Sequence, residues 1–197
     1  MRPDPFSLNT YLVRRKVLKI LGGAFHIYDP SGNVIAYSKM KAFKLKEDIR
    51  LYTGEDMGTE LLTIQARAII DFSAAYDVYD PRAREKVGAL RRRGFKSMFR
   101  DEWLVLDAAD AQVGLIQEDS TGLALVRRFI DAASLLFPQK YSVQMGGREV
   151  ATFKQNFNPF VYKLTVDLSG DPRGALDRRL AMGAALLMAA VEGKQQG

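Results

Sequence analysis

The stretch from Leu180 to Val191 reads Leu-Ala-Met-Gly-Ala-Ala-Leu-Leu-Met-Ala-Ala-Val, without a charged or strongly polar side chain. The segment before it, from Arg173 to Arg179, is polar. A helix that is apolar on every face must be surrounded by protein or by lipid. The run is shorter than the roughly 20 residues that span a bilayer. We therefore expect a helix over about residues 174–192 that lies in the core of the protein.

The residues upstream of this segment are typical of strands and turns. Tyr162, Leu164, Val166 and Leu168 alternate with polar residues, a period of two that fits a strand with one buried face. Leu62, Ile64, Ala66 and Ala68 alternate in the same way. Turn-forming residues separate such runs at 29–33, 53–55, 146–147 and 169–172. This spacing predicts an antiparallel β-sandwich or β-barrel, and the thin, alanine-rich helix fits inside a closed barrel.

One further helix is expected between these strands. Asp119 and Ser120 can cap its N-terminus, and Pro138 ends it. Its apolar residues recur at steps of three and four: Leu123, Val126, Ile130, Ala133 and Phe137. This amphipathic pattern predicts a helix that lies on the barrel or closes one of its ends.

The composition is that of a globular protein. A length of 197 residues fits one domain over 1–197, with a structured core over about 11–192. Cysteine is absent, which excludes disulfides and thiolate metal sites and suits a reducing cytoplasm. The apolar segment from Val17 to Phe25 is interrupted by Lys19 and is not typical of a signal peptide. The net charge of +6 favours anionic partners such as phospholipid headgroups or nucleic acid.

No group of residues in the sequence has the composition and spacing of a known catalytic site. His26 is the only histidine, and no Gly-x-Ser-x-Gly turn is present to expose a nucleophilic serine. The glycine pairs Gly22-Gly23 and Gly146-Gly147 are not followed by the lysine and helix of a phosphate-binding loop. We expect no catalytic residue, no metal site and no cofactor, and a role other than enzymatic.

Basic residues provide the candidate ligand-binding site. Lys39 and Lys41 share one face of a predicted strand, and Arg91 and Arg93 occupy the corresponding place in a second hairpin. If the two strands are neighbours, these four side chains can converge on a phosphorylated headgroup. The alternative is that they are solvated positions on the outside of the barrel. Nucleic acid is not expected, because nearby aromatics such as Trp103 have the spacing of wall residues.

The order of these elements resembles the tubby C-terminal-like superfamily, which includes tubby proteins, phospholipid scramblases and LURP-one-related proteins. The resemblance rests on the hairpin Phe25–Ile35 with the basic strand Ser38–Lys41, on Ala111–Ile116, and on the final strand and helix over Tyr162–Val191. It extends from about Tyr11 to about Glu192.

The resemblance implies a closed barrel of twelve antiparallel strands around the C-terminal helix, mainly β in class. Similarity to tubby proteins and scramblases implies binding of anionic phospholipid or phosphoinositide headgroups at a membrane surface. We expect a cytoplasmic protein that is peripheral at the membrane. Several features of scramblases are missing, among them cysteines and a proline-rich N-terminal region. The alternative function is a protein-interaction scaffold without a lipid ligand, for which the sequence names no partner.

Overall fold

The structure is a computed structural model, and it describes residues 4–16, 23–40, 48–67, 75–93, 102–119, 139–158 and 160–195. Structural statements below concern these residues. The predicted amphipathic helix over 119–137 lies almost entirely outside them, and so does Lys41. That helix, and the assignment of 1–197 to one domain, stay predictions.

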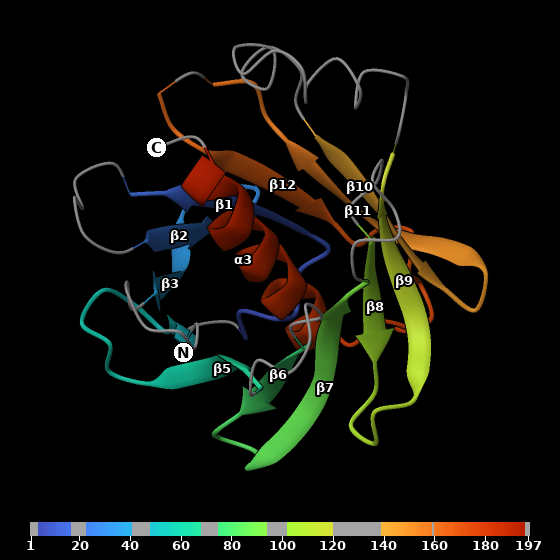
Figure 1. Ribbon diagram of the computed structural model, residues 1–197. Coiled ribbons are helices and arrows are strands. Elements are labelled where there is room, and N and C mark those ends of the chain that lie inside the picture. The colour runs from blue at the N-terminus through green and yellow to red at the C-terminus, as the bar shows by residue number, and fades with distance from the viewer. Residues whose placement is uncertain are drawn as a thin grey trace.

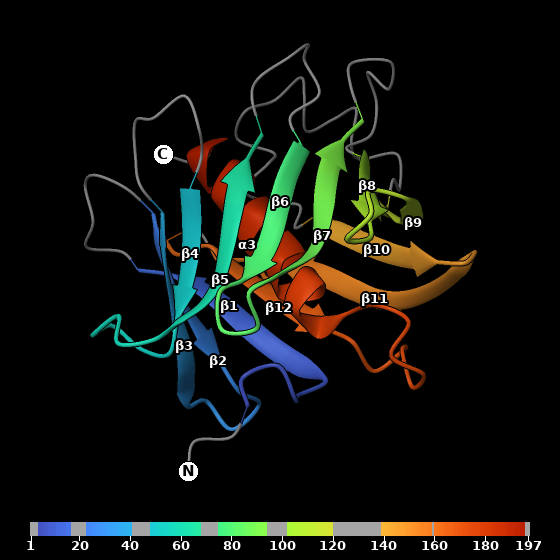
Figure 2. The same ribbon diagram turned by 90° about the horizontal axis from the view of Figure 1, so that it is seen from below.

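The described strands form a closed antiparallel barrel, as Figures 1 and 2 show. The strands are β1 (Thr10–Arg15), β2 (Ala24–Tyr28), β3 (Val34–Met40), β4 (Asp48–Tyr52), β5 (Glu60–Ala66), β6 (Ala75–Asp80), β7 (Glu85–Arg92), β8 (Glu102–Leu106), β9 (Gln112–Glu118), β10 (Lys140–Met145), β11 (Arg148–Gln155) and β12 (Lys163–Asp167). Each strand pairs with the next in sequence, and β1 pairs with β12 through Tyr11 opposite Val166. This last pairing closes the barrel and removes exposed sheet edges.

The apolar C-terminal segment forms helix α3 (Arg178–Gln195), which runs through the middle of the barrel (Figure 1). Every residue from Leu180 to Ala190 is buried, and Leu186 is 0% exposed. The prediction of a buried central helix is therefore confirmed.

The helix begins at Arg178, later than the expected residue 174, because two aspartates shape the chain before it. The carboxylate of Asp171 accepts hydrogen bonds from the backbone N–H groups of Ala175 and Leu176, both at 2.8 Å. Asp177 then caps the helix, since its Oδ1 accepts the N–H of Arg179 at 2.8 Å.

Glycine allows the helix and the wall to approach each other. A Cβ atom added to Gly88 on β7 would lie 2.5 Å from the carbonyl oxygen of Leu106 and 2.9 Å from Cδ2 of Leu180. A Cβ atom added to Gly183 on α3 would lie 3.0 Å from Cγ2 of Val78. Small residues on both partners therefore set the distance between helix and barrel.

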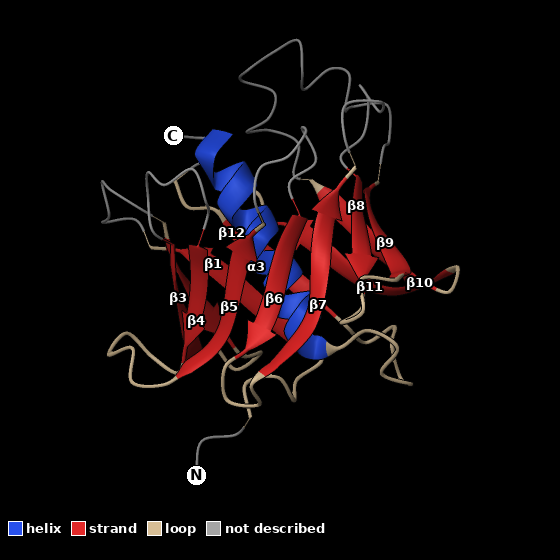
Figure 3. Cartoon of the chain, turned by 60° about the horizontal axis from the view of Figure 1, so that its bottom comes forward, coloured by secondary structure: helices blue, strands red, loops and turns tan. Residues whose placement is uncertain are grey.

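The barrel has two chemically different ends. The turn end carries the short connections that join β2 to β3, β4 to β5, β6 to β7, β8 to β9 and β10 to β11, and α3 begins there. At the opposite end β1, β3, β7 and β11 finish, β10 and β12 start, and α3 finishes. We call this opposite end the helix-exit end; Figure 3 shows the two ends at the bottom and the top of the barrel.

Candidate anion-binding surface

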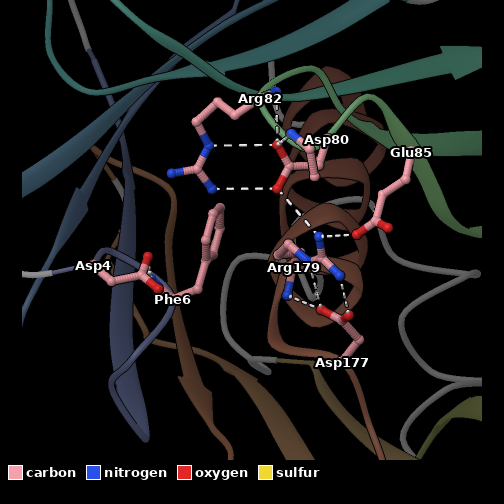
Figure 4. A network of polar contacts seen from close by, with 8 residues as sticks. Asp4, Phe6, Asp80, Arg82, Glu85, Asp177 and Arg179 are labelled. Carbon is pink, nitrogen blue, oxygen red and sulfur yellow. Dashed lines mark hydrogen bonds and ion pairs between the residues drawn. The ribbon is translucent and has the colours of Figure 1, made fainter.

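A network of ion pairs at the turn end fixes the start of α3 (Figure 4). The Asp80 side chain is 4% exposed, and its Oδ1 accepts the backbone N–H groups of Arg82 at 2.9 Å and Ala83 at 3.2 Å. Its Oδ2 accepts Nη1 of Arg179 at 3.2 Å, and the same Nη1 contacts Glu85 at 2.6 Å. Burial raises the pKa of Asp80, but the hydrogen bonds outweigh burial and hold that pKa below its ordinary value. These groups satisfy one another, so we assign the network a structural role.

A depression of about 420 Å³ lies on the outer face of β4 to β7, but its charges are already neutralised. It is lined by Arg50, Thr63, Gln65, Asp77, Tyr79 and Lys86. Arg50 contacts Asp48 and Glu60, each at 3.0 Å. Lys86 contacts Asp110 at 2.6 Å and Asp77 at 3.3 Å. A phosphate entering here would have to displace these carboxylates, so the depression is a poor anion site.

His26 is held by an acidic side chain from another part of the chain. Its Nε2 lies 2.5 Å from Oε1 of Glu55 in the β4–β5 connection, and Nζ of Lys16 lies 2.5 Å from Oε2 of the same carboxylate. The ring also packs beside Tyr37, with centroids 5.5 Å apart. These contacts give His26 a structural role in holding the β4–β5 connection against the barrel.

Clusters of histidine, cysteine, aspartate or glutamate able to hold a metal ion are absent from the residues that the structure describes. Within the same residues, no helix has the length and hydropathy needed to span a membrane.

Four cationic side chains form a row across adjacent strands at the helix-exit end. Arg14 on β1 lies directly opposite Lys163 on β12, and Lys154 on β11 lies directly opposite Lys140 on β10. Lys154 faces Thr165 on β12, which makes Lys163 its diagonal neighbour across the strand pair. We call these four residues the cation row.

The members of the row point away from the core, because each alternates with a buried residue. The buried neighbours are Val13, Leu164, Phe153 and Tyr141. Nζ of Lys140 pairs with Asp119 at 2.9 Å, a hydrogen bond that raises the pKa of Lys140. The other three row members make no ion pair with any residue in the described ranges.

Like charges directly opposite each other destabilise a sheet. The row contains two such pairs, so it lowers the stability of the isolated protein. Groups that destabilise the folded protein and make no compensating contact within it are typical of binding surfaces. The row therefore marks this arc of the barrel as a candidate surface for an anionic partner.

Exposed aromatic residues lie beside the row, in the connection between β11 and β12. Phe157 is 57% exposed and Phe160 is 86% exposed. They stand between Lys154 and Lys163, so that a lysine or phenylalanine occurs at every third position of this segment. The pattern Lys-x-x-Phe-x-x-Phe-x-x-Lys is visible in the sequence, but it has the period of neither a strand nor an amphipathic α-helix, so it predicts no element and no site by itself.

The predicted ligand residues lie at the same end of the barrel but not on neighbouring strands. Lys39 is near the end of β3 and Arg91 near the end of β7, so β4, β5 and β6 lie between them. The condition for all of them to converge on one headgroup is therefore not met. Arg91 is exposed, and Arg93, also exposed, pairs with Glu102 at 3.2 Å. Lys41 lies outside the described residues.

Charge is divided between the two ends. In the described part of the chain, acidic side chains outnumber basic ones at the turn end, where they include Asp29, Asp56, Glu85, Asp107, Glu149, Asp167, Asp171 and Asp177. Among the described residues of the helix-exit end, basic side chains outnumber acidic ones, and the cation row is joined there by Arg15, Lys39, Arg91, Arg92 and Arg93. An anionic surface would therefore attract the helix-exit end and repel the turn end.

Comparison with known proteins agrees with this architecture. The family model described as LURP-one-related matches residues 9–189, a range that contains all of β1 to β12 and most of α3. A search of curated proteins found no match. Because the family model covers nearly the whole barrel and its central helix, the chain belongs to the LURP-one-related family.

Proposed function

We propose that this barrel binds anionic phospholipid headgroups at a membrane surface, using the helix-exit end. The cation row carries the proposal. Arg14, Lys163, Lys154 and Lys140 keep like charges next to one another on adjacent strands, and a negatively charged surface would remove that repulsion. A sheet of headgroups supplies many separate anions, which suits cations spread along an arc better than one phosphate would.

The expected affinity is moderate. Each lysine or arginine near an anionic leaflet contributes about 1 kcal/mol, so the row contributes roughly 4 kcal/mol at low salt. This is enough for reversible attachment and too little for permanent anchoring. The acidic turn end opposes the reverse orientation, so the charge division also selects which end approaches the lipid.

Lys39, Arg91 and Arg93 contribute to the same proposal in a different way from the one first expected. They lie on other strands of the helix-exit end, apart from the cation row. Each would contact its own lipid headgroup when that end approaches a membrane. They would supplement the row instead of forming a single pocket with one another.

Vesicle co-sedimentation tests the proposal. The probes are vesicles of phosphatidylcholine alone, with phosphatidylserine, and with a phosphoinositide at matched total charge. The wild type should bind both anionic vesicles, less tightly as salt rises. The variant R14Q/K140Q/K154Q/K163Q should lose roughly 10²–10³-fold in affinity. R148Q/R173Q, which removes two exposed cations from the turn end, is the control for position and should bind as wild type does.

The variant K39Q/R91Q/R93Q measures the supplementary group, and it should weaken binding less than the row variant does. A preference for the phosphoinositide at equal charge would indicate recognition of that headgroup. Indifference of the wild type to lipid charge, salt and all these substitutions would refute the proposal and favour a scaffold without a lipid ligand.

A further inference from the structure

We infer that the β11–β12 connection is a membrane-inserting loop, in which Phe157 and Phe160 enter the lipid interface while the flanking lysines bind headgroups. This inference rests on the proposed function and specifies how the barrel sits on the lipid. Electrostatic attraction alone would hold the barrel at the lipid surface without insertion, whereas here the loop also enters the lipid.

The exposure of the two phenylalanines is the first argument. Phe160 is 86% exposed and Phe157 is 57% exposed, more than any other large apolar side chain of the described residues. An exposed valine or methionine is common on a soluble surface, but two neighbouring exposed phenylalanines at a loop tip mark a site that buries them against something else.

Hydrogen bonds hold the described residues of the loop in shape before any partner arrives. Oδ1 of Asn158 accepts the backbone N–H groups of Phe160 at 3.0 Å and Val161 at 2.9 Å. The N–H of Asn156 donates to the carbonyl oxygen of Lys163 at 2.9 Å, which closes the base of the loop. Insertion of a preformed loop orders few additional groups, so little of the binding energy is lost.

The surrounding charges indicate a membrane as the occupant. Lys154 and Lys163 flank the phenylalanines symmetrically, each three positions away. With the aromatic rings at the boundary between headgroups and acyl chains, long lysine side chains reach back to the phosphates. A protein groove would need its own acidic rim around an apolar pocket, whereas an anionic bilayer presents that combination everywhere.

A fluorescent label reports insertion directly. Because the chain contains no cysteine, F160C labelled with nitrobenzoxadiazole carries one probe at the loop tip. V34C is the matched control, since Val34 is 51% exposed and starts β3 at the turn end. With phosphatidylcholine–phosphatidylserine vesicles, emission from position 160 should shift to the blue and be quenched by doxyl-labelled lipid. Emission from position 34 should change little.

Affinity gives a second readout in the unlabelled protein. F157A and F160A should each weaken binding to these vesicles by about tenfold, from the apolar area that no longer leaves water. Their salt dependence should match that of the wild type, because the cation row is intact. V34A should bind as tightly as the wild type.

The outcomes separate the two proposals. Wild-type binding with no spectral change at position 160 and no loss in F157A or F160A overturns the insertion and leaves electrostatic binding in place. Absence of wild-type binding to anionic vesicles overturns both. If gel filtration shows that the wild type is a dimer and that F157A/F160A is a monomer with unchanged vesicle binding, the insertion is overturned and the loop is assigned to contact with a second copy of the chain.

Discussion

Removing charge from the cation row should stabilise the protein, contrary to the usual effect of substitution. The variant R14Q/K154Q takes one member from each directly opposed pair and leaves Lys163 and Lys140 in place. The reason is that two unit charges about 7 Å apart in water repel by about 0.6 kcal/mol. Lys140 is partly neutralised by Asp119, so the second pair contributes less than the first.

The two relieved repulsions should raise the free energy of unfolding by about 0.5–1 kcal/mol at 10 mM salt, where screening is weak. For a domain of this size the melting temperature should rise by about 1–4 °C. At 1 M salt the Debye length falls to about 3 Å, and the gain should disappear. Thermal unfolding followed by circular dichroism at both salt concentrations measures the effect.

The control is R148Q/R173Q, which removes the same formal charge from the turn end. A melting temperature of R14Q/K154Q that is equal to or below that of the control at 10 mM salt would refute the reasoning. A gain that persists unchanged at 1 M salt would also refute it, because it would have a cause other than repulsion. If the gain occurs and lipid binding falls in the same variant, the row exchanges stability for binding.

Three further predictions concern the fold. Leu186→Asp should unfold the protein by gel filtration and circular dichroism, since it removes ~2–5 kcal/mol of packing and buries an unpaired charge, against a typical 5–15 kcal/mol in total; a folded, monomeric mutant would contradict a central helix. Gly88→Ala should cost about 1–3 kcal/mol in urea unfolding, because its Cβ would lie 2.5 Å from the Leu106 carbonyl oxygen, whereas Gly58→Ala in the β4–β5 connection should change little. The pKa of Asp80 is lowered in the folded protein, so the ionised carboxylate stabilises the fold above about pH 4, and this stabilisation is lost as pH falls through the folded-state pKa. Asp80→Asn should therefore be less stable than the wild type at pH 7 and should lose less stability below about pH 4. An acid-unfolding profile identical to that of the wild type would count against this account.

Much of the barrel could be predicted because burial dictates local pattern. The alternation of Leu164 and Val166 with polar residues is visible in the sequence, and both are buried in β12. The apolar run in α3 is also too short to span a bilayer, so its burial in the core could be predicted. The helix start was misplaced because Asp171 and Asp177 cap different backbone groups, and either aspartate is a plausible cap in the sequence alone.

The candidate surface could be predicted only in part. Sequence identifies Lys39 and Arg91 as strand cations, but it does not state how many strands separate them. The cation row depends on register: Lys154 meets Lys140 across a hairpin, yet Arg14 meets Lys163 only because the first and last strands pair. A contact between residues so distant in sequence leaves no local pattern to read.

The pairing of β1 with β12, together with the position of α3 after all the described strands, has a consequence for biosynthesis. A ribosome delivers Thr10–Arg15 long before Lys163–Asp167 and the helix that fills the interior. Until those residues emerge, the nascent sheet has two unpaired edge strands, and its inner apolar face is not covered by α3. Folding of the barrel is therefore completed only after β12 and α3 have been made, and the contact between residues as distant in sequence as Tyr11 and Val166 predicts a slow final step. During that interval the exposed apolar face of the incomplete barrel would be available to bind chaperones.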